Sequence, residues 1–168
     1  KYILIKDNEI SNKDSERYFK LIEKRSKNYP VKYITGRCEF MGIDFKVCDG
    51  VLIPRPETEI LVEKAISLFG KYENIEVCDI CCGSGCIGLS VISFLKNAQL
   101  TSYDISDTAV NITTENALLL SLNERAKVFK KDILNEDSNG KFNLIVSNPP
   151  YISTEEYHAL MPDVKLYE

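Results

Sequence analysis

The fold of this chain is decided by one stretch, Asp79-Ile80-Cys81-Cys82-Gly83-Ser84-Gly85-Cys86-Ile87-Gly88. It joins a short apolar run, Ile75–Ile80, to a predicted helix over Ile87–Leu95. Gly83 and Gly85 allow the backbone to turn tightly and to approach a ligand closely. A strand, a glycine-rich turn and a helix in this order are typical of α/β domains with a parallel sheet, which bind ligands outside the carboxyl ends of their strands.

The alternation of strand and helix continues after this stretch. Apolar runs predict three further strands and one further helix: strands over Leu100–Ile105, Ala126–Phe129 and Phe142–Val146, and a helix over Asp107–Leu120. Because the turns between them are short, we expect a parallel α/β sheet that is covered on both faces.

The residues before this sheet follow other patterns. Three elements are predicted there, a short amphipathic helix, a β-hairpin and a second helix: residues 11–28, 38–47 and 60–68. The first helix begins with the capping residue Ser11 and is stopped by Pro30. The hairpin alternates around a turn near Gly42, and the second helix ends near Gly70.

Composition and charge limit the classes of protein to which this chain can belong. At 168 residues the chain suits one domain with a small appendage, and a net charge of −4 argues against a general affinity for nucleic acid. No stretch approaches the roughly 20 apolar residues of a membrane span. We expect a cytoplasmic protein without a secretory leader, and because the first residue is Lys1 we expect that the start has been removed.

Six cysteines have three interpretations: Cys38, Cys48, Cys78, Cys81, Cys82 and Cys86. Zinc has the C-x-x-C spacing in its favour, but the single histidine, His158, is remote. Disulfides require an exported protein. We favour reduced, non-ligating thiols packed where a strand turns into a helix, and predict no metal.

A carboxylate further along the chain suggests what the glycine turn binds. Asp104 ends the second predicted strand, 19 residues after Gly85. In this position a carboxylate accepts hydrogen bonds from ribose hydroxyls. The glycine turn and Asp104 together therefore predict a nucleoside-containing cofactor. The alternative is a turn needed only for packing, with Asp104 as the cap of the next helix. Gly83, Gly85 and Gly88 also match the dinucleotide pattern G-x-G-x-x-G, which is weak evidence by itself.

The chemistry is indicated by Asn148-Pro149-Pro150-Tyr151, which follows the last predicted strand. The asparagine amide offers an acceptor and donors, the prolines hold carbonyl oxygens rigidly, and the tyrosine offers a flat face. Together they form a pocket for a planar group that carries an –NH₂. Hydride transfer has no evident need for such a pocket, whereas methyl transfer to nitrogen does.

With these motifs the chain resembles the class I S-adenosylmethionine-dependent methyltransferases. Within them it is similar to the family that methylates the side-chain amide of glutamine in peptide chain release factors. Asn148–Tyr151 is shared with enzymes that methylate adenine in DNA. The stretches that favour the release-factor family are Pro30-Val31-Lys32-Tyr33-Ile34-Thr35-Gly36, Glu39-Phe40-Met41-Gly42, Leu52-Ile53-Pro54-Arg55-Pro56-Glu57-Thr58-Glu59 and Met161-Pro162-Asp163-Val164.

The resemblance implies a Rossmann-like fold, S-adenosyl-L-methionine as cofactor and a release factor as partner. The implied cofactor residues are Cys81, Cys82, Gly83, Ser84, Gly85, Asp104, Asp132 and Ile133. Asn148, Pro149, Pro150 and Tyr151 are implied as the catalytic and substrate-binding pocket. Arg55 and Glu57 either line the acceptor channel or form a surface ion pair of little energetic worth.

The chain departs from the family at Cys81, where the family usually has glycine. A side chain there either crowds the methionine end of the cofactor or is tolerated because φ is negative. The resemblance also implies a longer helical region before Lys1 and further strands after Glu168, so we expect a fragment. We assign residues 1–50 to the end of that helical region plus a hairpin linker, and 51–168 to a truncated methyltransferase domain.

Two other functions remain open. One is a DNA adenine methyltransferase, which calls for a basic face and a DNA-recognition region. The other is a non-catalytic binding module in which the change at Cys81 has abolished use of the cofactor.

Overall fold

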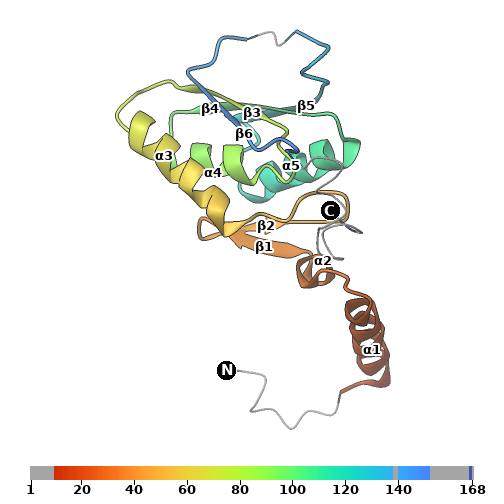
Figure 1. Cartoon of the computed structure of the whole chain (residues 1–168). Helices are drawn as coiled ribbons and strands as arrows, with labels where there is room; N and C mark the ends of the chain where they lie inside the picture. The colour runs from red at the N-terminus through yellow and green to blue at the C-terminus, as the bar shows by residue number, and fades with distance from the viewer. Residues whose placement is uncertain (1–9, 138–139, 152–166, 168) are drawn as a thin grey trace.

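The computed structural model describes residues 10–137, 140–151 and 167 of the 168-residue chain (Figure 1). The described residues form a helical arm, a two-stranded antiparallel hairpin and a four-stranded parallel sheet with its helices. His158 and the predicted motif Met161-Pro162-Asp163-Val164 lie outside the described residues.

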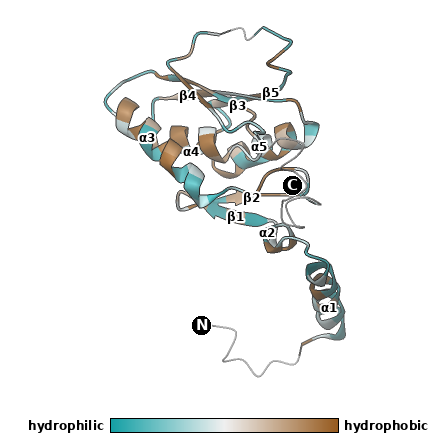
Figure 2. Ribbon diagram, in the orientation of Figure 1, coloured by the Kyte–Doolittle hydropathy of each residue, from teal (hydrophilic) through white to brown (hydrophobic). Residues whose placement is uncertain are grey.

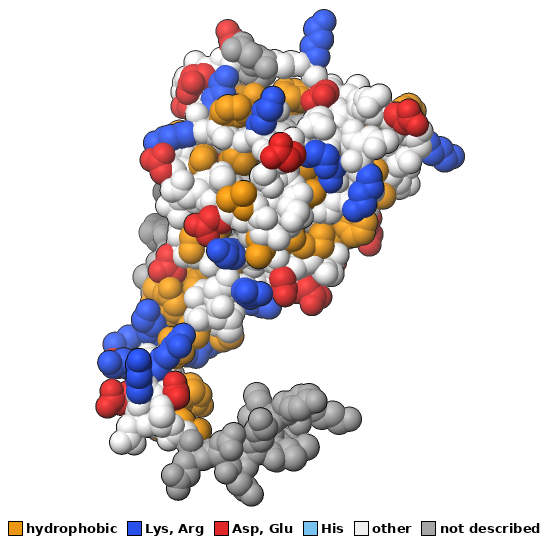
Figure 3. All heavy atoms as spheres, turned by 180° about the vertical axis from the view of Figure 1, so that it is seen from behind, with side chains coloured by type: hydrophobic (Ala, Val, Ile, Leu, Met, Phe, Trp, Pro, Cys, Tyr) orange, Lys and Arg blue, Asp and Glu red, His pale blue; other side chains and the backbone are white. Residues whose placement is uncertain are grey.

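The arm is helix α1, Asn12–Ser26, which confirms the first predicted helix. Its start is capped by Ser11, whose Oγ accepts the N–H of Asp14 at 3.1 Å. No side chain of α1 is buried, and the rings of Tyr18 and Phe19 are exposed. Lys and Arg side chains gather on this arm, with a few Asp and Glu side chains among them (Figure 3).

A second helix, α2, covers Val31–Thr35 and was not predicted. Pro30 takes the cap position before it, whereas α1 has already ended at Ser26 with Lys27 as its cap. Gly36 ends α2 in the left-handed conformation, with a φ of 69°. Five residues are too few for a recognisable helical period, which explains the missed prediction.

The predicted hairpin is confirmed by strands β1, Arg37–Phe40, and β2, Ile43–Lys46, which pair in antiparallel register. Met41 and Gly42 form the turn with φ values of 54° and 71°. Two consecutive positive φ angles suit the right-handed twist of the strands.

The main sheet is parallel throughout, in the order β5-β4-β3-β6. Its strands confirm the four predicted runs to within two residues: β3 is Glu76–Ile80, β4 is Gln99–Asp104, β5 is Ala126–Lys130 and β6 is Leu144–Ser147. From β3 the chain builds outward in one direction to β5, and it then returns to place β6 on the other side. The carboxyl ends of β3 and β6 therefore flank a topological switch point, where such sheets bind ligands.

Three helices lie together on one face of this sheet (Figure 1): α3, Glu59–Phe69, α4, Cys86–Phe94, and α5, Asp107–Leu119. A short 3-10 turn, Pro56–Thr58, leads into α3. The prediction that both faces are covered was wrong for the described residues. On the opposite face the side chains of Phe129 and Ile145 are 48% and 59% exposed.

The core lies between the sheet and these helices (Figure 2). Helix α4 is apolar nearly all round, and its residues 86–92 are buried. Phe40 and Phe45 of the hairpin are also buried in this core, together with Val62 and Leu89, so the hairpin is held against the helical face. Across the described ranges, no helix is both long and apolar enough to cross a bilayer.

Candidate active site

The loop between β3 and α4 has the tight backbone that its glycines predict. Gly83 and Gly85 have φ values of 56° and 76°, and the N–H of Gly85 donates to the carbonyl of Cys82 at 2.7 Å. A Cβ atom at Gly85 would lie 2.7 Å from Cγ2 of Thr113. Both conformation and space therefore require glycine at position 85.

The third glycine of the pattern has a different role. A Cβ atom at Gly88 would lie 2.8 Å from Oδ2 of Asp79 and 2.8 Å from Cδ1 of Leu100. Gly88 thus allows α4 to pack closely on β3 and β4. The G-x-G-x-x-G match reflects turn geometry and helix–sheet packing, and does not by itself indicate a dinucleotide.

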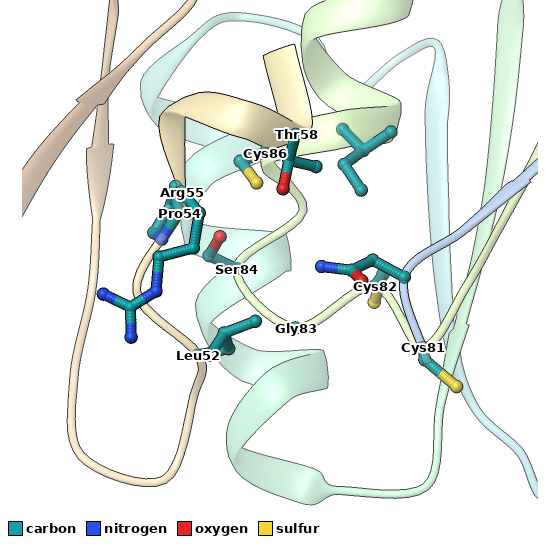
Figure 4. A pocket seen from close by; sticks show the side chains of 11 residues that line it. Leu52, Pro54, Arg55, Thr58, Cys81, Cys82, Gly83, Ser84 and Cys86 are labelled. Carbon is teal, nitrogen blue, oxygen red and sulfur yellow. The ribbon is translucent and has the colours of Figure 1, made fainter. Parts of the chain in front are cut away.

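Cys81 also has a positive φ, 59°. A side chain at this position was expected to be tolerated only with a negative φ, and that condition is not met. A non-glycine residue in the left-handed region costs about 1–3 kcal/mol. The thiol points away from the pocket formed by Leu52, Pro54 and Arg55 (Figure 4). Burial, followed by the nearby charge of Asp104, raises the pKa of Cys81 above its usual value.

Asp104 binds the loop directly. Its Oδ2 accepts the N–H of Gly83 at 2.9 Å, and its Oδ1 accepts the N–H of Ser106 at 3.0 Å. The cap of α5 is Ser106, whose Oγ accepts the N–H of Ala109, so the alternative that made Asp104 the helix cap was wrong. Each carboxylate oxygen retains a second lone pair that is able to accept a hydrogen bond from a hydroxyl group.

A cavity of about 170 Å³ opens beside Asp104 at the carboxyl edge of β3 and β4. Its lining combines one end of the glycine loop, the end of β4 and the turn after β5: Ile80, Cys81, Tyr103, Asp104, Ile105, Lys131, Asp132, Ile133, Leu134 and Pro150. Apolar walls with a carboxylate at one side suit a nucleoside, whose base is flat and whose ribose carries hydroxyl donors. The apolar walls and carboxylate acceptors of this cavity therefore fit the adenosine part of S-adenosylmethionine.

Asp132 lies in the turn after β5. Its pKa is held below the usual value by hydrogen bonds from the Asn135 side chain and from the N–H of Leu134. Its own N–H donates to Glu136 at 3.0 Å. These bonds fix the turn that brings Asp132 and Ile133 to the cavity.

A second, narrower cavity of about 40 Å³ lies on the other side of the loop (Figure 4). Leu52, Pro54 and Arg55 line it together with the loop, and so does Asn148, which follows β6. The Arg55 guanidinium points away from the loop (Figure 4). Cys81 lines both cavities, so the two spaces meet at this residue.

The four residues of the predicted acceptor pocket are placed unequally. Asn148 is half-buried and lines the narrow cavity, and Pro150 lines the wider one. Pro149 is exposed, and the Tyr151 ring is 80% exposed and lines neither cavity. Of the other predicted pair, Arg55 lines the narrow cavity, whereas Glu57 is exposed and does not.

Behind the loop lies a buried carboxyl group that no sequence pattern had indicated. Asp79 is fully buried, and its Oδ2 accepts the N–H of Gly88 at 2.9 Å. Burial, with a smaller contribution from the Asp104 charge, raises the pKa of Asp79 to about 7 against the opposing hydrogen bond from Gly88. Among the described residues its Oδ1 has no hydrogen-bond partner, nor has Ser102 Oγ on the neighbouring strand.

The thiols of the site remain separate. All six cysteines are free, and burial raises the pKa values of the Cys82 and Cys86 thiols, which keeps them protonated. Over the ranges that the structure describes, no group of three or more His, Cys, Asp or Glu side chains is placed to hold a metal ion.

Two known family models match the sequence of this chain. The family model described as the methyltransferase small domain matches residues 57–162, which is more than half of the chain. The chain belongs to the methyltransferase small domain family. A second model, described as the PrmC N-terminal domain, matches residues 1–36.

Curated relatives of this methyltransferase domain carry a more specific name. The chain is 46% identical over 164 residues to the release factor glutamine methyltransferase of Clostridium botulinum, covering 96% of this chain and 58% of the relative. It is 44% identical over 162 residues to the protein of the same name from Clostridium acetobutylicum, covering 95% of this chain and 57% of the relative. The chain thus spans a little over half the length of these relatives.

A solved structure supports the Rossmann-like methyltransferase fold. The crystal structure of ribosomal protein L11 methylase from Lactobacillus delbrueckii subsp. bulgaricus superposes with a TM-score of 0.51 at 27% identity. The match covers 61% of this chain and 51% of that one.

Several residues of the methyltransferase site were missed from the sequence. They are Leu52, Pro54, Thr58, Cys86 and Ile87 in the narrow cavity, Ile80, Tyr103, Ile105, Lys131 and Leu134 in the wide one, and Thr113 and Asn116 behind the loop. The last two had a signal, because they lie with Ala109, Ile112 and Ala117 on the buried face of α5. Polar side chains in an apolar stripe predict buried hydrogen bonds.

Proposed function

We propose that this protein is an S-adenosylmethionine-dependent methyltransferase that methylates the side-chain amide nitrogen (N5) of a glutamine in peptide chain release factors. One observation carries the proposal: Asn148 stands at the switch point of the sheet, against the loop whose other end borders the nucleoside cavity. An amide-bearing side chain there suits a nitrogen acceptor. The names of the curated relatives support the choice of release factors as substrate.

The cofactor would be held by residues at the wide cavity. Asp104 would accept hydrogen bonds from the ribose hydroxyls, the Asp132–Leu134 turn would flank the adenine, and the loop Cys81–Gly85 would bind the methionine part. When bound, S-adenosylmethionine would supply a methyl group on a positively charged sulfur. That methyl carbon would pass to the acceptor nitrogen, and the sulfur would keep the electron pair of the broken S–C bond as a neutral thioether.

The chain's own contribution is to position the acceptor. An amide nitrogen is a poor nucleophile because its lone pair is delocalised into the carbonyl group. We assign Asn148 Oδ1 and the Pro149 carbonyl to accept the two N–H bonds of the substrate amide, and the exposed Tyr151 ring to cover its face. This arrangement orients the nitrogen and stabilises the positive charge that develops on it. The proton leaves after transfer, without a dedicated base.

The remaining assignments follow from this function. Arg55 would line the acceptor channel, with Glu57 at its outer rim. Residues 51–168 would form the cofactor-binding domain, and residues 1–50 the end of a helical region plus a hairpin linker. A release factor as substrate places the protein in the cytoplasm and requires no direct contact with nucleic acid or membrane.

The test is a methylation assay on the full-length protein with two acceptors, a release factor and double-stranded DNA. We expect transfer to the release factor and none to DNA. The variant Asn148→Ala should lower turnover at least about a hundredfold, since orientation of the acceptor contributes several kcal/mol, while the dissociation constant of S-adenosylhomocysteine changes less than about twofold. Equal loss of both would refute the positioning role. Transfer to DNA would establish the adenine alternative, and no transfer with intact cofactor binding would favour a binding module.

A further inference from the structure

Asn116 is a buried amide on α5 that joins three segments distant in sequence. Its Oδ1 accepts the N–H of Lys46 at 2.8 Å, and its Nδ2 donates to the Lys46 carbonyl at 3.0 Å. The same Nδ2 donates to the carbonyl of Ser84 at 2.9 Å. The side chain has no exposed surface, so these bonds form where water does not compete.

Towards the hairpin, Asn116 acts as a strand would. A side-chain amide that both donates to and accepts from one residue reproduces the pairing of two backbone strands. Lys46 is the last residue of β2, so Asn116 fixes the end of the hairpin at the point where the chain leaves for residues 51–58. A surface ion pair between Lys46 Nζ and Glu115, at 3.1 Å, lies next to it.

Towards the loop, Asn116 acts together with Thr113, one helical turn earlier. Thr113 Oγ1 donates to the carbonyl of Gly83 at 2.9 Å, so α5 binds two consecutive loop carbonyls. In a trans peptide the C=O and the following N–H point in opposite directions. The N–H of Ser84 therefore points away from α5, and Ser84 lines the narrow cavity.

We propose that Asn116 is a positioning residue that holds the β1–β2 hairpin and the cofactor loop as one unit, so that the affinity of the loop for its cofactor depends on the docked hairpin. The identity of that cofactor rests on the proposed function. Coupling of this kind is reciprocal, so ligand bound at the loop also stabilises the docked hairpin.

The experiment measures binding of S-adenosylhomocysteine by calorimetry, and amide hydrogen exchange, on the 168-residue chain and three variants. Asn116→Ala should weaken binding about tenfold or more, since it leaves buried backbone groups without partners, and should speed exchange at both residue 46 and residues 83–85. Thr113→Val should weaken binding and speed exchange at the loop alone. Glu115→Ala, the matched control, removes the neighbouring ion pair and should change binding less than about twofold.

A second measurement needs no substitution. In the unmodified chain, saturating S-adenosylhomocysteine should slow exchange of the Lys46 amide, which donates to Asn116 and lies outside both cavities. Unchanged exchange at Lys46 would overturn the proposal, even where Asn116→Ala fails to fold. So would an Asn116→Ala variant that melts earlier but binds and exchanges normally.

The same experiment distinguishes an error in the proposed function from an error in the role of Asn116. If the unmodified chain does not bind S-adenosylhomocysteine, the cofactor assignment is wrong, and the exchange data decide the role of Asn116 alone. If amide exchange becomes faster at both the hairpin and the loop in Asn116→Ala, but not in Glu115→Ala, the two segments behave as one unit. Faster exchange at only one of the two segments would overturn the proposal.

Discussion

Two segments leave adjacent strands at the same edge of the sheet and differ in how they are supported. The loop Cys81–Gly85 follows β3, and Asn148–Tyr151 follows β6, with Ile80 and Ser147 in register and Ser147 Oγ bonded to the Ile80 carbonyl at 2.7 Å. Beyond that bond the loop is held by the Asp104, Thr113 and Asn116 side chains. In Asn148–Tyr151, by contrast, only Asn148 is half-buried, and the other three residues are exposed.

The difference suggests a division of labour. A small cofactor is bound best by a site that is preorganised by its own chain, because little ordering then remains to oppose binding. The protein substrate proposed above would bring its own surface, and the exposed aromatic ring and exposed prolines would be available for it to cover. Substitutions around the loop should therefore change cofactor affinity and stability, whereas those in Asn148–Tyr151 should change methyl transfer.

The largest effect around the loop is expected from Asp104→Ala. It removes the carboxylate that binds the Gly83 N–H and that we assign to the ribose. Hydrogen bonds to charged groups contribute about 1.5–3 kcal/mol, so S-adenosylhomocysteine should bind roughly ten- to a hundredfold more weakly in calorimetry. Asp107→Ala, which removes only a surface ion pair with Lys130, is the control. If Asp104→Ala binds as tightly as Asn148→Ala, the contrast between the two segments is lost.

Gly88→Ala tests the support behind the loop. The added methyl group meets Asp79 and Leu100 at 2.8 Å, and overpacking of this kind costs about 1–3 kcal/mol of unfolding free energy. Ser90→Ala, on the same helix, removes a buried hydroxyl without a partner among the described residues and should change stability by less than about 0.5 kcal/mol. Urea denaturation measures both, and equal stability of the two variants would contradict the close packing at Gly88.

Asp79→Asn tests the buried carboxyl group through pH. Because the folded pKa of Asp79, about 7, lies above its ordinary value of 3.8, the folded protein binds more protons than the unfolded chain between these values. Asp79 therefore contributes stability below about pH 4 that is lost as pH rises to about 7, at up to roughly 1.4 kcal/mol per pH unit.

Asn does not titrate, so the advantage of Asp79→Asn over the unmodified chain should grow from pH 4 to pH 7 and then level off. Urea denaturation at several pH values measures it. A difference that does not vary with pH would show that Asp79 is not protonated in the folded protein.

The smallest effect is expected from Cys81→Gly, which removes the side chain from a left-handed residue. Removal of the backbone strain stabilises the folded chain, and the greater loss of entropy by glycine on folding offsets part of this gain. The net gain in unfolding free energy should be about 1 kcal/mol, measured by thermal denaturation. Cys81→Ala removes the thiol but keeps the strain, so it should leave stability nearly unchanged. Equal stabilisation by both variants would assign the effect to the thiol.

The sheet and hairpin were predictable because their signals are local. Alternation around Gly42 and apolar runs separated by short turns determine which residues pair. The site was predictable where a motif follows a strand end, as at Asp104 and Asn148. Thr113 and Asn116 bind backbone groups 30 to 70 residues away, and no local pattern names those partners. The prediction that both faces of the sheet are covered was wrong for the described residues, because an apolar strand suggests burial without identifying the element that would cover it.

The Tyr103 ring in the wall of the wide cavity has a spectroscopic consequence. The chain has nine tyrosines and no tryptophan, and Lys131 Nζ lies 5.4 Å from the centre of this buried ring. A base that enters the cavity should change the surroundings of the Tyr103 ring, and with them its absorption and emission. Replacement of the exposed neighbour Ile105 by tryptophan would give the cavity the sole indole of the chain, so that fluorescence follows occupancy without a chemical label.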